Sequence, residues 1–143
     1  MYVETILKKK GDTVITVDPA DAISSVAQIL NDNGIGAALV RNAGGEIVGV
    51  ISERDIVRGI ARQKDACLTK RAEELMTSPV ISCAPTDNID DIMQLMTDRR
   101  IRHLPVMEDG ALRGVISIGD VVKQRISEIE NESAALRQYI ATG

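Results

Sequence analysis

The sequence repeats itself, and this repeat is the feature that most limits what the chain can fold into. The segments "GEIVGVISERD" at 45–55 and "GALRGVISIGD" at 110–120 share two glycines, a serine and an aspartate in one frame, 65 residues apart. Upstream, "VITVDPADAISSVAQILNDNGIGAALV" from Val14 matches "VISCAPTDNIDDIMQLMTDRRIRHLPV" from Val80 at an offset of 66 residues. A one-residue change of offset between matched blocks is what duplication followed by drift in a turn leaves. We therefore expect two copies of one structural unit.

Each copy predicts the same order of elements: short strand, helix, strand, tight turn, strand, helix. The first helix of each copy has an apolar stripe at i, i+3, i+4 and i+7. Its members are Ile23, Val26, Ala27 and Leu30 in one copy and Ile89, Ile92, Met93 and Met96 in the other. The runs "GAALV" and "HLPVM" are typical of short buried strands, and "NAGGE" and "EDG" of the turns that lead into "IVGVIS" and "LRGVIS". A mixed α/β (α+β) fold follows.

Similar lead-ins, "VETIL" and "AEELM", precede the two copies. We expect a first repeat with its lead-in at 1–70, a second repeat at 71–126 and a helical extension at 127–143. The extension continues a run with 4-3-4-3-4 spacing, formed by Val122, Ile126, Ile129, Ser133, Leu136 and Ile140. Such spacing favours packing on a partner or across a dimer. A helix that folds back onto its own core explains the run equally well.

Composition excludes several classes of function. The 143 residues are 44% apolar but include two Tyr and no Phe or Trp, so the core must be aliphatic. The net charge of −4 argues against a nucleic-acid binder, which usually has a basic face. No apolar run has the length of a membrane span, and the first residues lack the apolar region of a signal peptide. With Cys67 and Cys83 isolated, we expect a reduced setting, either the cytosol or an organelle matrix, and take cytoplasmic as the location.

The sequence offers little to an enzyme. It has one histidine, His103, and none of the common hydrolase, metalloprotease or phosphate-loop motifs. Cys83 and His103 could meet in space, but a pair without a third, orienting group is weak support for nucleophilic catalysis. The acidic residues are scattered rather than spaced as metal ligands. We expect no catalytic residues, no metal and no enzymatic activity.

The duplicated Ser-x-x-Asp segment remains as the chemical signal. Ser52 and Ser117 each end a strand just before a helix, and Asp55 and Asp120 follow three residues later. A helix N-terminus carries free N–H groups and partial positive charge, which attract phosphate. A carboxylate one turn in can accept two hydrogen bonds from the vicinal hydroxyls of a ribose. The alternative is purely structural: the serines cap the helices, the aspartates complement the helix dipole, and duplication copied both.

Basic residues distinguish the second copy from the first. Arg102 and His103 directly precede the apolar residues "LPV" of a strand, where they could meet phosphate. Gly36 and Ala37 occupy these two positions in the first copy. The two copies are therefore not chemically equivalent.

Two units of about sixty residues, each with "G-x-h-x-G-h-h-S-x-x-D" (h, apolar) after an "h-P-V"-like strand, resemble a tandem pair of cystathionine β-synthase (CBS) domains, a Bateman module. The resemblance extends from about Val3 to Ile126. It implies two β-α-β-β-α CBS repeats packed about a pseudo-twofold axis, with a C-terminal helix outside the pair. In the family, adenosyl ligands such as AMP, ADP, ATP, S-adenosylmethionine or NAD(H) bind in clefts between the repeats.

Carried over by position, the resemblance puts Asp55 and Asp120 on ribose and Ser52 and Ser117 near phosphate. Arg102 and His103 would also meet phosphate. Thr77 and Ser82 would lie beside the base, on the first strand of the second repeat. Arg54 is a candidate for the charge that the first repeat lacks at Gly36 and Ala37.

The expected function is a non-enzymatic sensor that binds an adenine nucleotide (AMP, ATP or NAD(H)). The resemblance further implies a homodimer that modulates a separate, unidentified protein, with neither membrane nor nucleic acid as partner. The alternative is a structural or interaction scaffold, also dimeric, whose ligand clefts are vestigial; the departures in the first repeat favour it. An enzyme that acts on the bound nucleotide is a third, disfavoured hypothesis.

Overall fold

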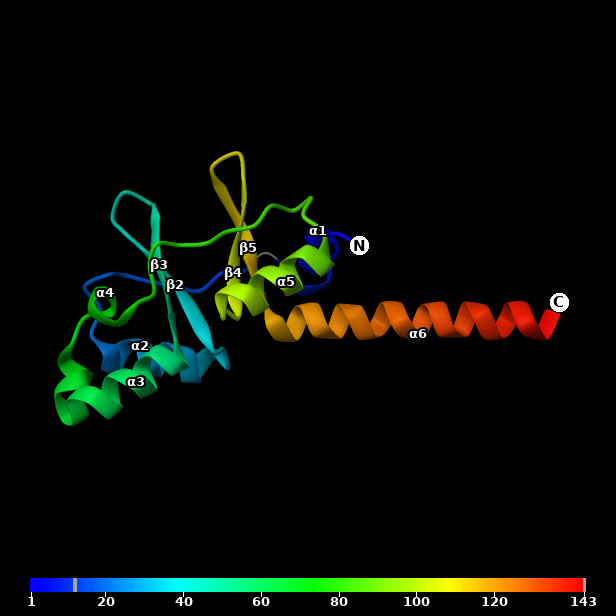
Figure 1. The fold of residues 1–143 in the computed structure, drawn as a ribbon. Helices are drawn as coiled ribbons and strands as arrows, with labels where there is room; N and C mark the ends of the chain where they lie inside the picture. The colour runs from blue at the N-terminus through cyan, green and yellow to red at the C-terminus, as the bar shows by residue number, and fades with distance from the viewer. Residues whose placement is uncertain (12, 143) are drawn as a thin grey trace. The chain divides into compact units, whose positions relative to one another are not determined.

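A computed structural model describes residues 1–11 and 13–142 of the chain (Figure 1). It is a mixed α+β structure with two small sheets, and it divides into two compact units. Residues 13–81 form one, here called the first-repeat unit. Residues 1–11 and 82–142 together form the other, the second-repeat unit. Each sheet thus belongs to one of the two expected repeats.

The first-repeat unit is built on a three-stranded sheet in the order β1-β2-β3. Its strands are β1 (Thr16–Val17), β2 (Ala37–Arg41) and β3 (Ile47–Ser52), with β1 parallel and β3 antiparallel to β2. Its helices are α2 (Ile23–Asn33), α3 (Glu53–Gln63), the 3-10 helix η1 (Lys64–Thr69) and α4 (Ala72–Leu75). The core is aliphatic, as expected: Val17, Ile23, Val26, Leu30, Val40 and Ile51 are all buried.

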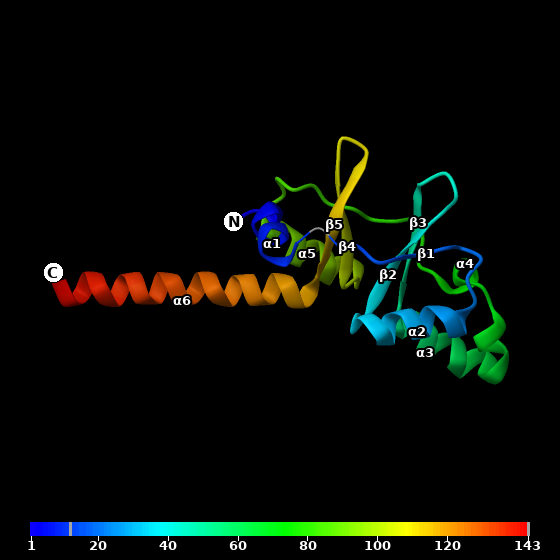
Figure 2. The ribbon, with the colours of Figure 1, turned by 180° about the vertical axis from the view of Figure 1, so that it is seen from behind.

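The second-repeat unit has a two-stranded antiparallel sheet, β4 (His103–Glu108) with β5 (Ala111–Ser117). The strand expected at "VISC" is reduced to one parallel bridge between Cys83 and Val106. The helices are α1 (Val3–Lys10), α5 (Ile89–Arg99) and α6 (Ile118–Thr142). Figures 1 and 2 show α6 as a single unbroken helix that continues well past β4 and β5. The apolar core of the second-repeat unit includes Val3, Ile89, Ile92, Met96, Leu104, Ile116 and Val121.

The periodicity of both first helices is confirmed. Ile23, Val26 and Leu30 are the buried residues of α2, and Ile89, Ile92 and Met96 are those of α5. Both helices end in a left-handed residue that closes the last turn, Gly34 (φ 61°) and, unusually for a residue with a side chain, Arg100 (φ 54°). Equivalent sequence positions thus adopt equivalent backbone geometry even where the residue type has changed.

The lead-ins are exchanged between the units. The N-terminal turn of α1 donates from Val3 and Glu4 N–H to the carbonyls of Asp87 and Pro85, at 3.0 and 2.9 Å. In the other unit, Ala72 and Glu73 of α4 donate to the carbonyls of Asp21 and Pro19, at 2.8 and 3.0 Å. The sequence predicts a boundary between residues 70 and 71, whereas the compact unit of the first repeat extends to residue 81. The packing, however, places each lead-in on the repeat that it does not directly precede.

The repeated glycine before each Ser-x-x-Asp makes room for these lead-ins. A Cβ at Gly49 would collide with the Met76 side chain, and one at Gly114 would lie 2.7 Å from Leu7 Cδ2. Met76 follows α4, and Leu7 is part of α1. The glycine of the motif therefore serves the contact between strand and lead-in.

Candidate functional site

Both Ser-x-x-Asp segments form a reciprocal cap at the start of a helix. At α3, Asp55 N–H donates to Ser52 Oγ (3.2 Å) and Ser52 N–H donates to Asp55 Oδ2 (2.9 Å). At α6, Asp120 N–H donates to Ser117 Oγ (3.2 Å) and Ser117 N–H donates to Asp120 Oδ2 (2.9 Å). The structural role weighed in the sequence is thus present in both copies. It fixes each carboxylate at the carboxyl end of a strand, beside a helix N-terminus.

Thr77 lies beside Asp55, although the two are 22 residues apart in the sequence. Thr77 Oγ1 donates to Asp55 Oδ1 at 3.3 Å. The backbone of Thr77 pairs with β3, since Thr77 N–H donates to Val50 O at 2.8 Å and Val50 N–H donates back at 3.1 Å. The segment that follows α4 therefore extends the first-repeat sheet and brings a hydroxyl to the motif carboxylate.

A lysine lies on Asp120. Lys10, at the end of α1, donates to Asp120 Oδ2 at 2.7 Å and to the carbonyl of Val115 at 2.9 Å. Burial alone would raise the pKa of Asp120, but hydrogen bonds from Lys10 and from the Ser117 N–H outweigh it and lower the pKa below its ordinary value. Sequence reasoning missed Lys10. The extra "KKKGD" that lengthens the first lead-in was the available signal.

The basic residues of the second repeat lie at the same end of their sheet as Ser117. His103 is the cross-strand partner of Ser117, and the carbonyl of Arg102 accepts from Ile118 N–H at 2.8 Å. The His103 side chain is half-buried and that of Arg102 is exposed. In the first-repeat unit, Ala37 pairs with Ser52, and the carbonyl of Gly36 accepts from Glu53 N–H at 2.9 Å. The backbone is thus repeated while the cationic side chains are not.

Two other expected site residues, Ser82 and Arg54, are exposed. Ser82 precedes Cys83; among the described residues, no hydrogen bond joins it to Ser117 or Asp120. Arg54 is exposed on the first turn of α3.

Burial, with a smaller effect of the Asp87 carboxylate, raises the pKa of the Cys83 thiol to about 12. A thiol that stays protonated at neutral pH is a poor nucleophile.

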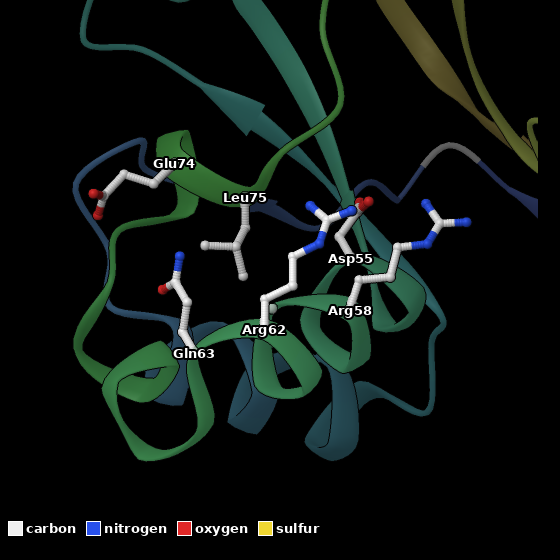
Figure 3. Close-up of a pocket in the computed structure, with 7 residues that line it drawn as sticks. Asp55, Arg58, Arg62, Gln63, Glu74 and Leu75 are labelled. Atoms are coloured by element: carbon white, nitrogen blue, oxygen red, sulfur yellow. The ribbon is translucent and has the colours of Figure 1, made fainter.

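The first-repeat unit contains a cavity of about 190 Å³ along α3, next to the motif carboxylate (Figure 3). Its lining consists of Asp55, Arg58, Gly59, Arg62, Gln63, Glu74 and Leu75. Figure 3 shows the Arg58 and Arg62 side chains projecting from α3 on the side of Asp55. Arg54 is not part of this lining, so two arginines that sequence reasoning missed bring positive charge near Asp55. Their i, i+3, i+7 spacing from Asp55 was the signal that could have found them.

Two general findings complete the description. Across residues 1–11 and 13–142, no three histidine, cysteine or acidic side chains come together as a metal site would require. None of the helices in this part of the chain has both the length and the apolarity needed to cross a bilayer.

The chain is similar to known proteins over nearly all of its length. A curated relative, the mitochondrial CBS domain-containing protein CBSX3 of Arabidopsis thaliana, is 32% identical over 99% of this chain and 72% of its own. Among solved structures, a CBS-domain containing protein of Agrobacterium tumefaciens superposes with a TM-score of 0.85 at 42% identity, covering 87% of this chain and 92% of its own.

Two further solved structures are described with ligands. A CBS domain protein of Pyrobaculum aerophilum, complexed with AMP, has a TM-score of 0.74 at 29% identity, covering 84% of this chain and 89% of its own. The CBS domain pair of protein MJ0100, in complex with 5′-methylthioadenosine and S-adenosyl-L-methionine, has a TM-score of 0.77 at 25% identity, covering 90% and 98%. The family model of the CBS domain matches this chain twice, at 6–62 and 72–127. The chain therefore belongs to the CBS-domain family and carries two CBS domains in tandem.

Proposed function

We propose that this protein is a non-enzymatic regulatory module that binds an adenosyl ligand at its two Ser-x-x-Asp segments. The observation that carries the proposal is the duplicated geometry, in which a motif carboxylate and serine are fixed at the start of α3 and again at the start of α6. Two CBS-domain relatives with adenosyl compounds bound support the ligand class. AMP, ATP, NAD(H) and S-adenosylmethionine are the candidate ligands.

In this proposal Asp55 and Asp120 accept hydrogen bonds from the ribose hydroxyls. Each carboxylate uses Oδ2 to close its cap. At Asp55 the other oxygen, Oδ1, accepts a hydrogen bond from the exposed hydroxyl of Thr77, which a ribose hydroxyl can replace. Ser52 and Ser117, at the helix N-termini, lie where phosphate is favoured.

The positive charge for phosphate comes from different residues in the two units. In the second-repeat unit, this charge comes from Lys10, Arg102 and His103, at the end of the sheet where α6 and Asp120 begin. In the first-repeat unit, Arg58 and Arg62 line the cavity that Asp55 shares. Thr77 and Ser82 remain the candidates for contact with the base.

Regulation would follow from linkage. A ligand shifts a conformational equilibrium only as far as it binds one conformation better than another, and a separate partner protein would respond to that shift. The alternative function is a structural or interaction scaffold. It is favoured by the closed caps, because a Ser-x-x-Asp segment with purely structural work would have the same hydrogen bonds.

Calorimetric titration with AMP, ATP, NADH and S-adenosylmethionine tests the proposal. Asp55→Asn and Asp120→Asn keep a capping acceptor but remove the charge. We expect each to weaken ligand binding at its own unit by roughly tenfold to a hundredfold, the value of a hydrogen bond to a charged group. Asp109→Asn, in the exposed turn between β4 and β5, is the matched control. If none of the four ligands binds to the folded protein, the scaffold function is favoured.

A further inference from the structure

The second half of α6 is not buried by the rest of its own unit. Near its start, Val121 and Gln124 are buried, and the Glu128 side chain is only 13% exposed. From Ile129 to Thr142 every residue is exposed. Figures 1 and 2 show this part of the helix continuing beyond the other elements of its unit. A helix that folds back on its own core, one of the two sequence alternatives, is therefore wrong for these residues.

The exposed part carries an apolar stripe with the spacing of a coiled coil. Apolar residues with large exposed fractions lie along one side, among them Ile126 (51%), Ile129 (52%), Leu136 (60%) and Ile140 (68%). Their 4-3-4-3-4 spacing assigns Ile126, Ser133 and Ile140 to heptad position a, and Val122, Ile129 and Leu136 to position d. The stripe is continuous over three heptads except at Ser133. A row of exposed apolar residues marks an interaction site, and its spacing fits a partner helix with the same repeat.

The charges beside the stripe select the partner and its direction. Position g is occupied by Arg125 and Glu132, and position e by Lys123, Glu130 and Arg137. In a parallel, in-register pair, each g residue faces the e residue five places later on the other helix. Arg125, which also pairs with Asp90 and Glu128 of its own unit, then faces Glu130 of the second copy. Glu132 faces Arg137 of the second copy. All four contacts in the symmetric pair are attractive.

The antiparallel arrangement is disfavoured by the same residues. It sets e against e and g against g, so Glu130 faces Glu130, Glu132 faces Glu132 and Lys123 faces Arg137. Each of these contacts is repulsive. We propose that α6 joins two copies of this chain as a parallel, in-register coiled coil. The apolar stripe of α6 is the contact surface of this dimer, and the pairing requires no bound ligand.

A cysteine at the centre of the stripe tests the arrangement. In a parallel in-register pair each a residue faces itself, so Ser133→Cys should form a disulfide-linked dimer in an oxidised-glutathione buffer. Asn131→Cys, at the outward position f, is the matched control and should stay unlinked. The native Cys67 and Cys83 are buried and do not compete. If Ser133→Cys fails to link while a mixture of Ser133→Cys and Ile129→Cys chains does, the helices are antiparallel and the proposal is overturned.

Charge reversal tests the pairing independently. Glu132 and Arg137 are exposed and have no ion pair among the described residues, so changing them removes no salt bridge of the unit. Glu132→Arg and Arg137→Glu should each raise the dissociation constant of the dimer about fivefold, measured by sedimentation. The double variant should restore it. Leu136→Asp should leave a folded monomer, checked by circular dichroism. A wild-type chain that sediments as a monomer, or a dimer that survives Leu136→Asp, would refute the proposal.

Discussion

The two motif carboxylates have the same backbone surroundings but different neighbours. Asp55 receives the hydroxyl of Thr77, and Asp120 receives the ammonium of Lys10. Thr77 pairs with the backbone of Val50, and Lys10 donates to the carbonyl of Val115, the equivalent residue of the second repeat. Thr77 and Lys10 thus both reach a motif carboxylate, Thr77 from a segment that pairs with the strand and Lys10 through its side chain. The repeats diverged in their lead-ins more than in the motif itself.

The difference concerns charge. In the second-repeat unit, Lys10 joins Arg102 and His103 at the end of the sheet where α6 and Asp120 begin. The first-repeat unit has Gly36 and Ala37 at the positions of Arg102 and His103. The first-repeat unit instead carries its arginines on α3. We expect the second-repeat unit to favour the more highly phosphorylated ligands close to the motif. The following changes break or sharpen this comparison.

The largest effect is expected where the lead-ins meet the motif glycines. Gly49→Val and Gly114→Val should each reduce the free energy of unfolding by about 1–3 kcal/mol, because a branched side chain must displace the lead-in. Substitution by Ala, a smaller change, should cost more stability at Gly49 than at Gly114. At Gly49 three atoms of Met76 stand in the way, whereas at Gly114 only the end of Leu7 does. Urea denaturation measures both, and Gly119→Ala, which meets only Ser117 Oγ at 3.6 Å, is the control. Equal costs for the two Ala variants would contradict this account.

A smaller effect is expected from giving the first repeat a basic side chain at the position of His103. Ala37 pairs with Ser52 as His103 pairs with Ser117. If the proposed function holds, Ala37→His should raise the affinity of the first-repeat unit for ATP relative to adenosine by roughly threefold to tenfold, since it adds one charge-assisted hydrogen bond. Titrations of the Asp120→Asn background measure this unit alone. Ala37→Gln supplies a neutral control, and an equal gain from it would rule out charge as the cause.

The smallest effect on stability is expected at Lys10. The Asp120 pKa is lowered, so its carboxylate stabilises the fold above the ordinary pKa of about 4, and this contribution is lost as the pH falls through the lowered value. Lys10→Met should raise the Asp120 pKa and cost about 0.2–1 kcal/mol at pH 7, because both side chains are partly exposed. The difference from wild type should shrink in acid. Lys8→Met, at an exposed residue of the same helix, is the control. An effect that is independent of pH would exclude the ion pair as its source.

Much of the fold could be predicted because its signals are local. The apolar stripes of α2 and α5, the hairpin turns and the Ser-x-x-Asp caps each lie within about a dozen residues. The exchange of lead-ins could not be predicted, since "VETIL" and "AEELM" are similar enough for either to pack on either repeat. The pair of Lys10 and Asp120 spans 110 residues, and no local pattern specifies such a contact. The strand expected at "VISC" shrank to Cys83 because only one residue there pairs with β4.

The exchanged lead-ins also set an order in which the protein can be assembled as it is synthesised. The first-repeat unit is one continuous stretch, residues 13–81, so it can fold before the remainder has been translated. The second-repeat unit needs α1, which is made before the first-repeat unit, together with β5 and α6, which are made after it. During translation α1 must therefore wait for its own sheet. Asp120 can receive its lysine only after the whole first-repeat unit has been translated, so the second site is completed after the first.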